Sequence, residues 1–249
     1  YNLPCIAASE FPNLEEGSAE EEIEVDAKKL SKMIDKTRFA ISSDETRYYL
    51  NGLYLHISKR NDKNQLCNVA TDGHRLALSF VEFDNFKNPF GVIIPKKSVN
   101  EIRKIIDNVD SVKLSISRVK IKIKAGDNTM ISKLIDGEFP DYNKILPQNN
   151  DKIIKISKKN FFDCVDRVST VANDKHKAIK LTIENNKMEL EVSTNDGSFA
   201  HEILPIEYRG EKIITGFNSI YLKDVISQID NDILTLRLKD SMSPALIDG

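Results

Sequence analysis

The stretch Ala70-Thr71-Asp72-Gly73-His74-Arg75-Leu76-Ala77-Leu78 contains the first copy of a phrase that returns later as Thr194-Asn195-Asp196-Gly197. The two Asp-Gly pairs lie 124 residues apart. Two further phrases recur in the same order at nearly the same spacing. They are Phe11-Pro12-Asn13-Leu14 with Phe139-Pro140-Asp141-Tyr142, and residues 91–98 with residues 212–219. Each phrase alone is common in turns and at strand ends. Their shared order and spacing therefore predict that the chain contains a structural repeat.

Each predicted repeat contains two amphipathic helices. Apolar residues recur at helical spacing in four segments, which are residues 26–41, 95–109, 158–172 and 219–229. Asp26 stands where a helix N-cap is expected, because its side chain can accept a hydrogen bond from the first turn, and Ser157 and Asn218 directly precede the third and fourth segments. Pro95 suits the first helical position, where its missing N–H group costs nothing.

Strand patterns fill the segments between these helices. Apolar residues alternate with polar ones over residues 112–116, 119–123, 179–183, 188–192 and 233–238. The pair Asn185-Asn186 separates two of these patterns and predicts a hairpin turn. More strands than helices, with the helices amphipathic, favour an α+β fold of repeated domains in which two helices cover one face of antiparallel sheets.

The repeat predicts three segments along the chain. Residues 1–18 are expected to be the end of a preceding domain and a linker, residues 19–148 one domain, and residues 149–249 another. The acidic run over residues 15–22 is interpreted as a solvated linker, with an acidic binding tail as the alternative. The chain has no initiator Met, so we expect it to be part of a longer protein that also extends beyond Gly249.

The bulk composition excludes several classes of protein. The 249 residues carry a formal net charge of only -2, which predicts no partner. Three widely spaced cysteines, Cys5, Cys67 and Cys164, form neither a disulfide framework nor a zinc motif. No signal peptide and no apolar run long enough for a membrane span stand in the sequence. We therefore expect a cytoplasmic protein that does not interact with membranes.

Positive charge concentrates in the predicted helices. The net charge is +3 over residues 26–40, +2 over 95–108, +1 over 157–172 and -1 over 218–230, so the remaining residues carry -7. Basic helices on an otherwise acidic protein would attract a polyanion on one side, although lysines on solvated helices are also ordinary. The side chains expected to face DNA are Lys28, Lys29, Lys32, Lys96, Lys97, Arg103, Lys158 and Lys159. They can hold phosphates without reading bases.

The sequence offers little for catalysis. Asp72 and His74 could suggest acid–base chemistry, and a hydrolase with a site at Asp72, His74 and Arg75 is one alternative. The chain has only four histidines and lacks zinc-site pairings, phosphate-binding glycine loops and nucleophile elbows. Asp72-Gly73 is better interpreted as a turn, and we expect no catalytic residue, no cofactor and no metal. A protein-interaction scaffold that never contacts DNA is the second alternative.

Several strings resemble the bacterial DNA polymerase sliding clamp, the beta subunit of the replicative polymerase. The resemblance is carried by residues 47–52 with the Ala70–Leu78 string, by residues 135–147, and by residues 216–222, in the order of that family. It implies a ring of two subunits joined head to tail, with three similar domains per subunit, helices lining the interior and sheets outside. It implies a processivity factor that encircles double-stranded DNA and tethers DNA polymerases and the clamp loader. This chain alone would not close such a ring.

The resemblance also implies a peptide-binding cleft between the two domains. The matching positions are Leu50, Thr71, Gly73, His74, Arg75, Leu76, Pro140, Lys144, Ile145, His176, Asn218, Tyr221 and Met242. Its apolar members would form the walls, and its polar members would hold polar groups of the peptide. His176 and Lys144 depart from the Phe and Arg common in the family, and the family's C-terminal strand is absent after Gly249. For DNA, the resemblance adds Arg47, Tyr48 and Tyr49.

Overall fold

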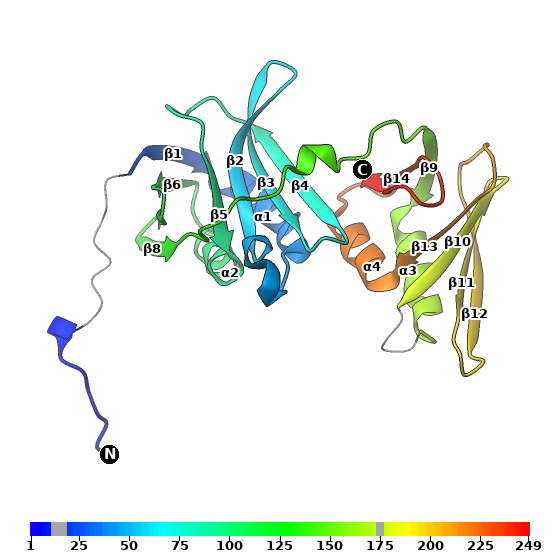
Figure 1. The fold of residues 1–249 in the computed structure, drawn as a ribbon, viewed down its shortest axis with the longest axis horizontal. Helices are drawn as coiled ribbons and strands as arrows, with labels where there is room; N and C mark the ends of the chain where they lie inside the picture. The colour runs from blue at the N-terminus through cyan, green and yellow to red at the C-terminus, as the bar shows by residue number, and fades with distance from the viewer. Residues whose placement is uncertain (11–18, 173–176) are drawn as a thin grey trace. The chain divides into compact units, whose positions relative to one another are not determined.

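The computed structural model describes residues 1–10, 19–172 and 177–249, and these form two compact units, Tyr1–Pro140 and Asp141–Gly249 (Figure 1). A short 3-10 helix, η1 (Ala8–Glu10), precedes the first sheet strand. Among the described residues no helix is long and apolar enough to cross a membrane.

The first unit contains two helices and two four-stranded antiparallel sheets. One sheet has the order β1-β6-β7-β8, and the other has the order β4-β3-β2-β5. The helices are α1 (Ala27–Asp35) and α2 (Lys96–Ile105), with short 3-10 helices η2 (Arg38–Ala40) and η3 (Glu45–Leu50) after α1. The strands are β1 (Glu21–Asp26), β2 (Gly52–Arg60), β3 (Lys63–Thr71), β4 (Leu76–Glu82), β5 (Gly91–Pro95), β6 (Ser111–Ile116), β7 (Lys120–Ala125) and β8 (Asn128–Lys133).

The second unit repeats this topology. Its sheets have the orders β15-β14-β9 and β12-β11-β10-β13, so each of its strands has a counterpart in the first unit, whereas β8 of the first unit has none among the described strands of the second. The helices are α3 (Lys158–Ser169) and α4 (Ser219–Gln228), preceded by the 3-10 helix η4 (Tyr142–Lys144). The strands are β9 (Lys152–Ser157), β10 (Ala178–Glu184), β11 (Lys187–Ser193), β12 (Phe199–Pro205), β13 (Ile213–Asn218), β14 (Ile233–Leu238) and β15 (Leu246–Asp248).

Each unit consists of two similar halves that exchange their first strands. In the first unit each half consists of one strand, one α-helix and then three further strands. Yet β1 pairs with β6 of the second half, and β5 pairs with β2 of the first half. The same exchange joins β9 to β14 and β13 to β10 in the second unit. Neither half can therefore complete a sheet without the other.

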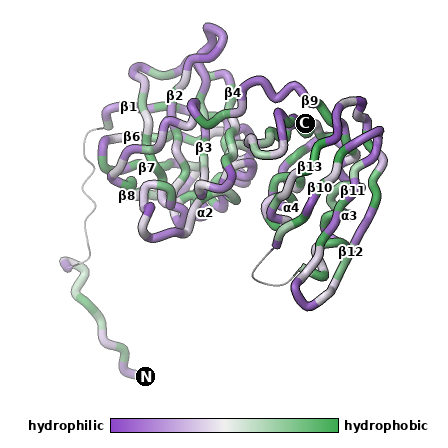
Figure 2. The backbone as a smooth tube through the Cα atoms, turned by 45° about the vertical axis from the view of Figure 1, so that its right-hand side comes forward, coloured by the Kyte–Doolittle hydropathy of each residue, from purple (hydrophilic) through white to green (hydrophobic). Residues whose placement is uncertain are grey.

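Each unit has its own hydrophobic core between its helices and its sheets. In the first core Leu30 and Met33 of α1 pack with Val99 and Ile102 of α2, and all four are at most 3% exposed. In the second core α3 packs beside α4, with Phe161 fully buried. Hydrophilic residues gather in turns such as Asn61-Asp62 between β2 and β3 (Figure 2), where both residues have positive φ. The α+β fold of repeated units, each with two amphipathic helices on antiparallel sheets, is thereby confirmed.

The repeated phrases mark equivalent places in the two units. Asp72-Gly73 joins β3 to β4 and Asp196-Gly197 joins β11 to β12, and the two glycines have φ values of 89° and 87°. Residues 91–98 and 212–219 both span the end of a strand and the start of a helix. The Phe11-Pro12 phrase lies outside the described residues, as does the first half of the acidic run, residues 15–18. The domain boundary after residue 148 stays a prediction.

Three details of the helix predictions were wrong. The helix expected over residues 26–41 ends at Asp35, because the Thr37 hydroxyl donates back to the Met33 carbonyl oxygen at 2.7 Å and the chain continues as η2. Pro95 is not the first helical residue but the N-cap, because its ψ of 144° belongs to β5. The other helices also end one to four residues before the predicted ends, as frayed termini commonly do.

Candidate functional site

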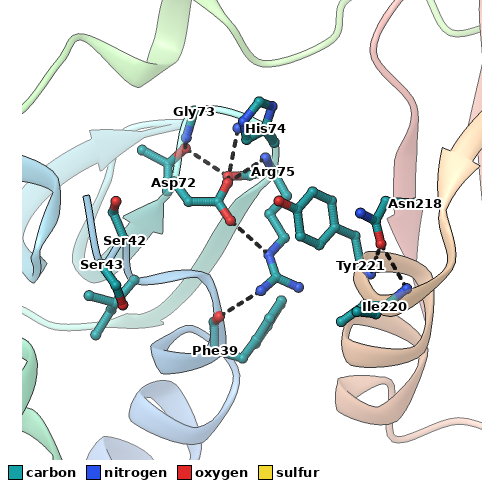
Figure 3. A network of polar contacts seen from close by, with 12 residues as sticks. Phe39, Ser42, Ser43, Asp72, Gly73, His74, Arg75, Asn218, Ile220 and Tyr221 are labelled. Carbon is teal, nitrogen blue, oxygen red and sulfur yellow. Dashed lines mark hydrogen bonds and ion pairs between the residues drawn. The ribbon is translucent and has the colours of Figure 1, made fainter. Parts of the chain in front are cut away.

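The turn between β3 and β4 is held by its own side chains. Asp72 Oδ1 accepts hydrogen bonds from the backbone N–H groups of His74 at 2.9 Å and Arg75 at 3.0 Å (Figure 3). Thr71 Oγ1 accepts from the Gly73 N–H at 3.0 Å and donates to the Arg75 carbonyl oxygen at 2.7 Å. Gly73 and His74 remain exposed at the tip. The sequence prediction of an Asp-Gly turn is confirmed, and the turn presents a backbone surface that a ligand could approach.

The Arg75 side chain points into the protein from this turn. Its Nε lies 3.2 Å from Asp72 Oδ2, and its Nη2 donates to the Phe39 carbonyl oxygen at 3.0 Å. The guanidinium also lies 5.1 Å from the centre of the Phe39 ring. With its side chain only 15% exposed, Arg75 fastens the turn to η2. Its contacts are those of a supporting residue.

Arg47 fastens the same turn from the other side. Its Nη2 donates to the Asp72 carbonyl oxygen at 3.0 Å, and its Nε donates to Asp44 Oδ2 at 2.9 Å. Hydrogen bonds from Thr46 and from Arg47 lower the pKa of Asp44 to about 2. A Cβ atom on Gly73 would lie 2.3 Å from Arg47 Nη1, so the guanidinium would have to shift to admit any other residue, and the positive φ of 89° also favours glycine. Sequence reasoning placed Arg47 toward DNA and missed this support. The sequence feature that could have indicated this supporting role was Asp44, an acidic residue three positions before Arg47.

The apolar positions expected in the first unit differ in exposure. Leu50 ends η3 and is only 4% exposed, whereas Leu76 at the start of β4 and Pro140 are half-buried. Leu50 is therefore a core residue, while part of the Leu76 side chain is exposed on the protein surface.

In the second unit, Asn218 and Tyr221 lie at the start of α4. Asn218 Oδ1 accepts from the N–H groups of Ile220 at 2.9 Å and Tyr221 at 3.4 Å (Figure 3), which makes Asn218 the N-cap of α4. The cap contacts therefore use the side-chain oxygen of Asn218 and not its amide nitrogen. Tyr221 is half-buried in the first turn of the helix.

Two loops of the second unit carry the remaining apolar positions. Ile145 follows η4 and is 52% exposed, and the preceding Lys144 ammonium lies 3.2 Å from Asp141 Oδ2, which lowers the pKa of Asp141. Met242 is 91% exposed. The sequence prediction missed Asp240, whose Oδ1 accepts from the Met242 N–H at 2.9 Å and fixes the loop that presents this methionine. His176 lies outside the described residues.

The basic helical residues fall into two groups. Lys28, Lys29, Lys32, Lys97 and Lys159 are exposed. The others make contacts within their own unit: Lys96 donates to Ser43 Oγ at 2.8 Å, Lys158 donates to the Ile229 carbonyl oxygen, and Arg103 is bonded to Asp35 at 2.8 Å and to Asp107. Of these five exposed lysines, all but Lys32 lie in the first turn of their helix, and Lys32 lies in the last turn of α1.

Tyr48 and Tyr49 form an edge-to-face pair on η3, with ring centres 5.9 Å apart. Tyr48 is 53% exposed, and Tyr49 is half-buried. Gly137 lies against this pair, since a Cβ there would be 3.2 Å from Tyr49 Cβ. Tyr48 is thus the ring that an outside partner could contact.

Asp72 and His74, the two side chains that could suggest acid–base chemistry, have different positions at the turn. Asp72 is fully used in holding the turn, and His74 projects from the exposed tip. Within residues 1–10, 19–172 and 177–249, no group of three or more His, Cys, Asp or Glu side chains is placed to hold a metal ion.

Two duplicated units, each with a pair of helices on antiparallel sheets, define a protein of the DNA-clamp class. Residues 24–141 match the model of the DNA polymerase III beta subunit central domain, and residues 143–249 match that of its C-terminal domain. The chain belongs to the DNA polymerase III beta subunit family, the bacterial sliding clamps of DNA replication.

Individual relatives agree with this assignment. The chain is 39% identical to the beta sliding clamp of Caulobacter vibrioides over 249 residues, which is 99% of this chain and 67% of the relative. It is 34% identical to that of Rickettsia felis, covering 68% of it. A crystal structure of the Bartonella birtlesii sliding clamp bound to griselimycin has a TM-score of 0.94 and 40% identity, covering 100% of this chain and 68% of that chain.

A second solved structure is also similar to this chain. The Caulobacter crescentus beta sliding clamp, described with polyethylene glycol bound to a proposed beta-motif tethering region, has a TM-score of 0.94. It is 39% identical and covers 99% of this chain and 67% of that chain.

Proposed function

We propose that this chain forms part of a ring that encircles duplex DNA without reading its sequence and tethers polymerases and the clamp loader to it. In this ring α1, α2, α3 and α4 line the interior, two subunits join head to tail, and the sheets lie outside. The ring supplies no catalysis of its own, and a turnover assay with ester, peptide and phosphoester substrates is expected to give no activity.

One observation carries the DNA-binding part of this proposal. Lys28 and Lys29 lie in the first turn of α1, Lys97 in that of α2 and Lys159 in that of α3. The helix dipole favours anions at this end and disfavours cations, by about 0.3–1 kcal/mol for each charge. The lysines at these helix starts therefore carry an electrostatic cost, and a polyanionic partner would offset it. Together with the helix N–H groups they suit phosphates.

The DNA-binding proposal is tested by removing these charges. The variant Lys28→Gln, Lys97→Gln, Lys159→Gln is compared with Lys59→Gln, Lys155→Gln, Lys239→Gln, which loses the same charge at exposed positions away from the helix starts. Fluorescence anisotropy with two duplexes of unrelated sequence is measured over a salt series. We expect equal affinity for both duplexes and a slope of log K against log salt that is smaller by about 2–3 in the helix variant only. A preference for one duplex, or equal slopes in both variants, would contradict the proposal.

We also propose that partner peptides dock on the turn at Thr71–Leu76 and on the surface of α4 and its neighbouring loops. The turn is stiffened by Arg47 and Arg75, so it loses little freedom when a peptide binds. Met242 offers an adaptable apolar contact on a loop fixed by Asp240. Aliphatic and aromatic side chains of a short peptide would complement this mixture of apolar walls and polar rims.

The docking proposal is tested with a fluorescent peptide from a polymerase tail. Leu76→Ala and Tyr221→Ala are each expected to weaken binding by about tenfold, the loss of one buried contact. The control is Ile214→Ala, which removes a 47% exposed side chain from β13 outside the proposed site. Unchanged affinity in both site variants, with the fold intact by circular dichroism, would refute this docking surface while leaving DNA binding open.

A further inference from the structure

The core of the first unit, whose helices and strands are labelled in Figure 1, encloses a small cavity. Ten residues from α1, α2, β2, β3, β5, β6 and β7 line it, and each is at most 4% exposed. Among these described residues nine are apolar, and the tenth is Asn68 of β3. A water molecule can place its centre within about 10 Å³ of this space, roughly the room that one buried water requires.

Asn68 stands on the core-facing side of β3. Its neighbours on the same side of the strand, Leu66 and Ala70, belong to the first hydrophobic core. Across the sheet Asn68 is opposite Leu55 on β2 and Ser79 on β4. Because Asn68 is 0% exposed, bulk solvent does not reach its side chain. A primary amide is therefore placed among apolar side chains.

The amide of Asn68 is not satisfied by the protein. Within the part of the chain that the structure describes, neither Oδ1 nor Nδ2 of Asn68 has a hydrogen-bond partner. An asparagine side chain carries an acceptor oxygen and two N–H donors. Burying these groups unpaired is costly, and the large majority of buried polar atoms have a protein or water partner. The site therefore favours a small molecule that both donates and accepts hydrogen bonds.

The second unit shows that the fold does not require an amide at this place. The turn before β3 and the turn after it each lie 124 residues before their counterparts around β11. At the same spacing the counterpart of Asn68 is Val192, which is 2% exposed in the second core. Valine thus fills this position within the same topology. The polar group of Asn68 is accordingly explained by what it binds.

We propose that Asn68 binds one buried water molecule in the core of the first unit. In this site Nδ2 donates to the water oxygen, and the water donates to Oδ1 of the same amide. These are two polar contacts, the lower end of the range for buried waters. Fixing the water costs entropy, but this cost is typically smaller than that of leaving a buried amide unpaired.

Other occupants fit the cavity less well. An ion would be buried beside lining residues of which, among those the structure describes, none is charged. An apolar molecule larger than water exceeds the space and leaves both polar atoms of Asn68 unpaired. Water matches both the size of the cavity and the chemistry of the amide.

The proposed water is separated from solvent by the packed helices. Leu30 and Ile34 of α1 and Val99 and Ile102 of α2 line the cavity and are at most 3% exposed. The water can therefore exchange only when the packing between these helices and the sheets opens locally. Its residence time consequently reports how often the first core opens.

The number of long-lived buried waters is measured in solution by magnetic relaxation dispersion of water with the full chain. Asn68→Leu retains nearly the shape of asparagine without its polar atoms, and Asn68→Val introduces the residue of the second unit. The control is Asn64→Leu, the same change on the same strand at a residue that donates to Asp84 Oδ1 at 2.9 Å.

We expect the dispersion amplitude to fall by the contribution of one water molecule in both Asn68 variants and to stay unchanged in the control. Equal amplitudes for the parent and the Asn68 variants would overturn the proposal, as would an equal loss in the control.

A crystal structure of the parent at atomic resolution is the second measurement, and it needs no substitution. We expect a peak of electron density within hydrogen-bond distance, about 2.7–3.2 Å, of both Oδ1 and Nδ2 of Asn68. Density that contacts neither amide atom, or no density beside the amide, would contradict the water site. This result decides the proposal even where a variant does not fold.

Discussion

Gly73 and Gly197 occupy equivalent turns of the two units with nearly equal positive φ, but their surroundings differ. A Cβ at position 73 would meet the Arg47 guanidinium at 2.3 Å, whereas nothing lies within 4 Å of one at position 197. We expect Gly197→Ala to cost only the backbone strain, about 1 kcal/mol, and Gly73→Ala to cost about 1–2 kcal/mol more. Urea unfolding followed by fluorescence or circular dichroism measures both.

The two alanine variants control for each other, because the same residue change is made at the same φ. Adding Arg47→Ala to Gly73→Ala is expected to recover part of the difference, since the crowded guanidinium is then gone. Equal destabilisation by both single variants would mean that Arg47 does not restrict residue 73.

His56 makes the first unit sensitive to acid. It is 7% exposed and stacks on Tyr54 with ring centres 4.4 Å apart, while Tyr54 stacks on Phe139 at 4.8 Å. Burial lowers the pKa of His56 from 6.5 to about 4, because the charged imidazole is poorly solvated. The neutral form is thus favoured in the folded state. The contribution of neutral His56 to the free energy of unfolding is complete above pH 6.5. It is lost as the pH falls towards 4, by up to roughly 3 kcal/mol.

The variant His56→Phe tests this dependence, because phenylalanine retains a ring beside Tyr54 without a titrating group. We expect its stability to vary less than that of the parent between pH 6.5 and 4, measured by urea unfolding at each pH. Asp44, with its pKa of about 2, changes state below this window and affects both proteins alike. Parallel stability curves for the two proteins would contradict the assignment to His56.

The predicted site residues illustrate what sequence can determine at the scale of a residue. Asp72-Gly73 was predicted as a turn because both residue types favour it locally, and the turn is present. Arg103 was predicted to face DNA because it lies on a basic helix. Its partner Asp35 is 68 residues away, and no local pattern shows which distant carboxylate will pair with it. The hydrogen bond from Arg47 to the Asp72 carbonyl oxygen, 25 residues away, was missed for the same reason.

At the scale of the element, Lys159 links stability to function. It lies in the first turn of α3, where a positive charge opposes the helix dipole. We expect Lys159→Glu to raise the free energy of unfolding by about 0.5–1 kcal/mol, with a smaller gain for Lys159→Gln. The same change should weaken duplex binding. A loss of stability with glutamate, measured by urea unfolding, would show that the lysine stabilises the helix by another contact.

Helix starts were predictable, but the pairing of strands was not. The N-cap Asp26 was correctly assigned, because capping depends on residues within one turn, and the helices expected directly after Ser157 and Asn218 begin there. The exchange of β1 and β5 between halves joins residues that are distant in sequence, which alternation of apolar residues does not encode. Alternation of apolar and polar residues indicates which face of a strand is buried. The neighbouring strand with which it pairs is determined only when the core assembles.

At the scale of the whole molecule, duplication explains why two units with different sequences share one topology. The repeat was predictable because turns such as Asp72-Gly73 and Asp196-Gly197 require particular residues. The docking surfaces were predicted from family resemblance, and their residues remain proposals to be tested.

The central claim is that a ring containing this chain holds DNA by surrounding it. The most direct measurement loads a clamp subunit that includes these 249 residues onto a nicked circular plasmid with its clamp loader, followed by a wash at high salt. We predict that the clamp stays on the circle and is released when a restriction enzyme makes the DNA linear, because phosphate contacts are weakened by salt while encirclement is not. Equal retention on circular and linear DNA, or complete loss from the circle at high salt, would contradict the account.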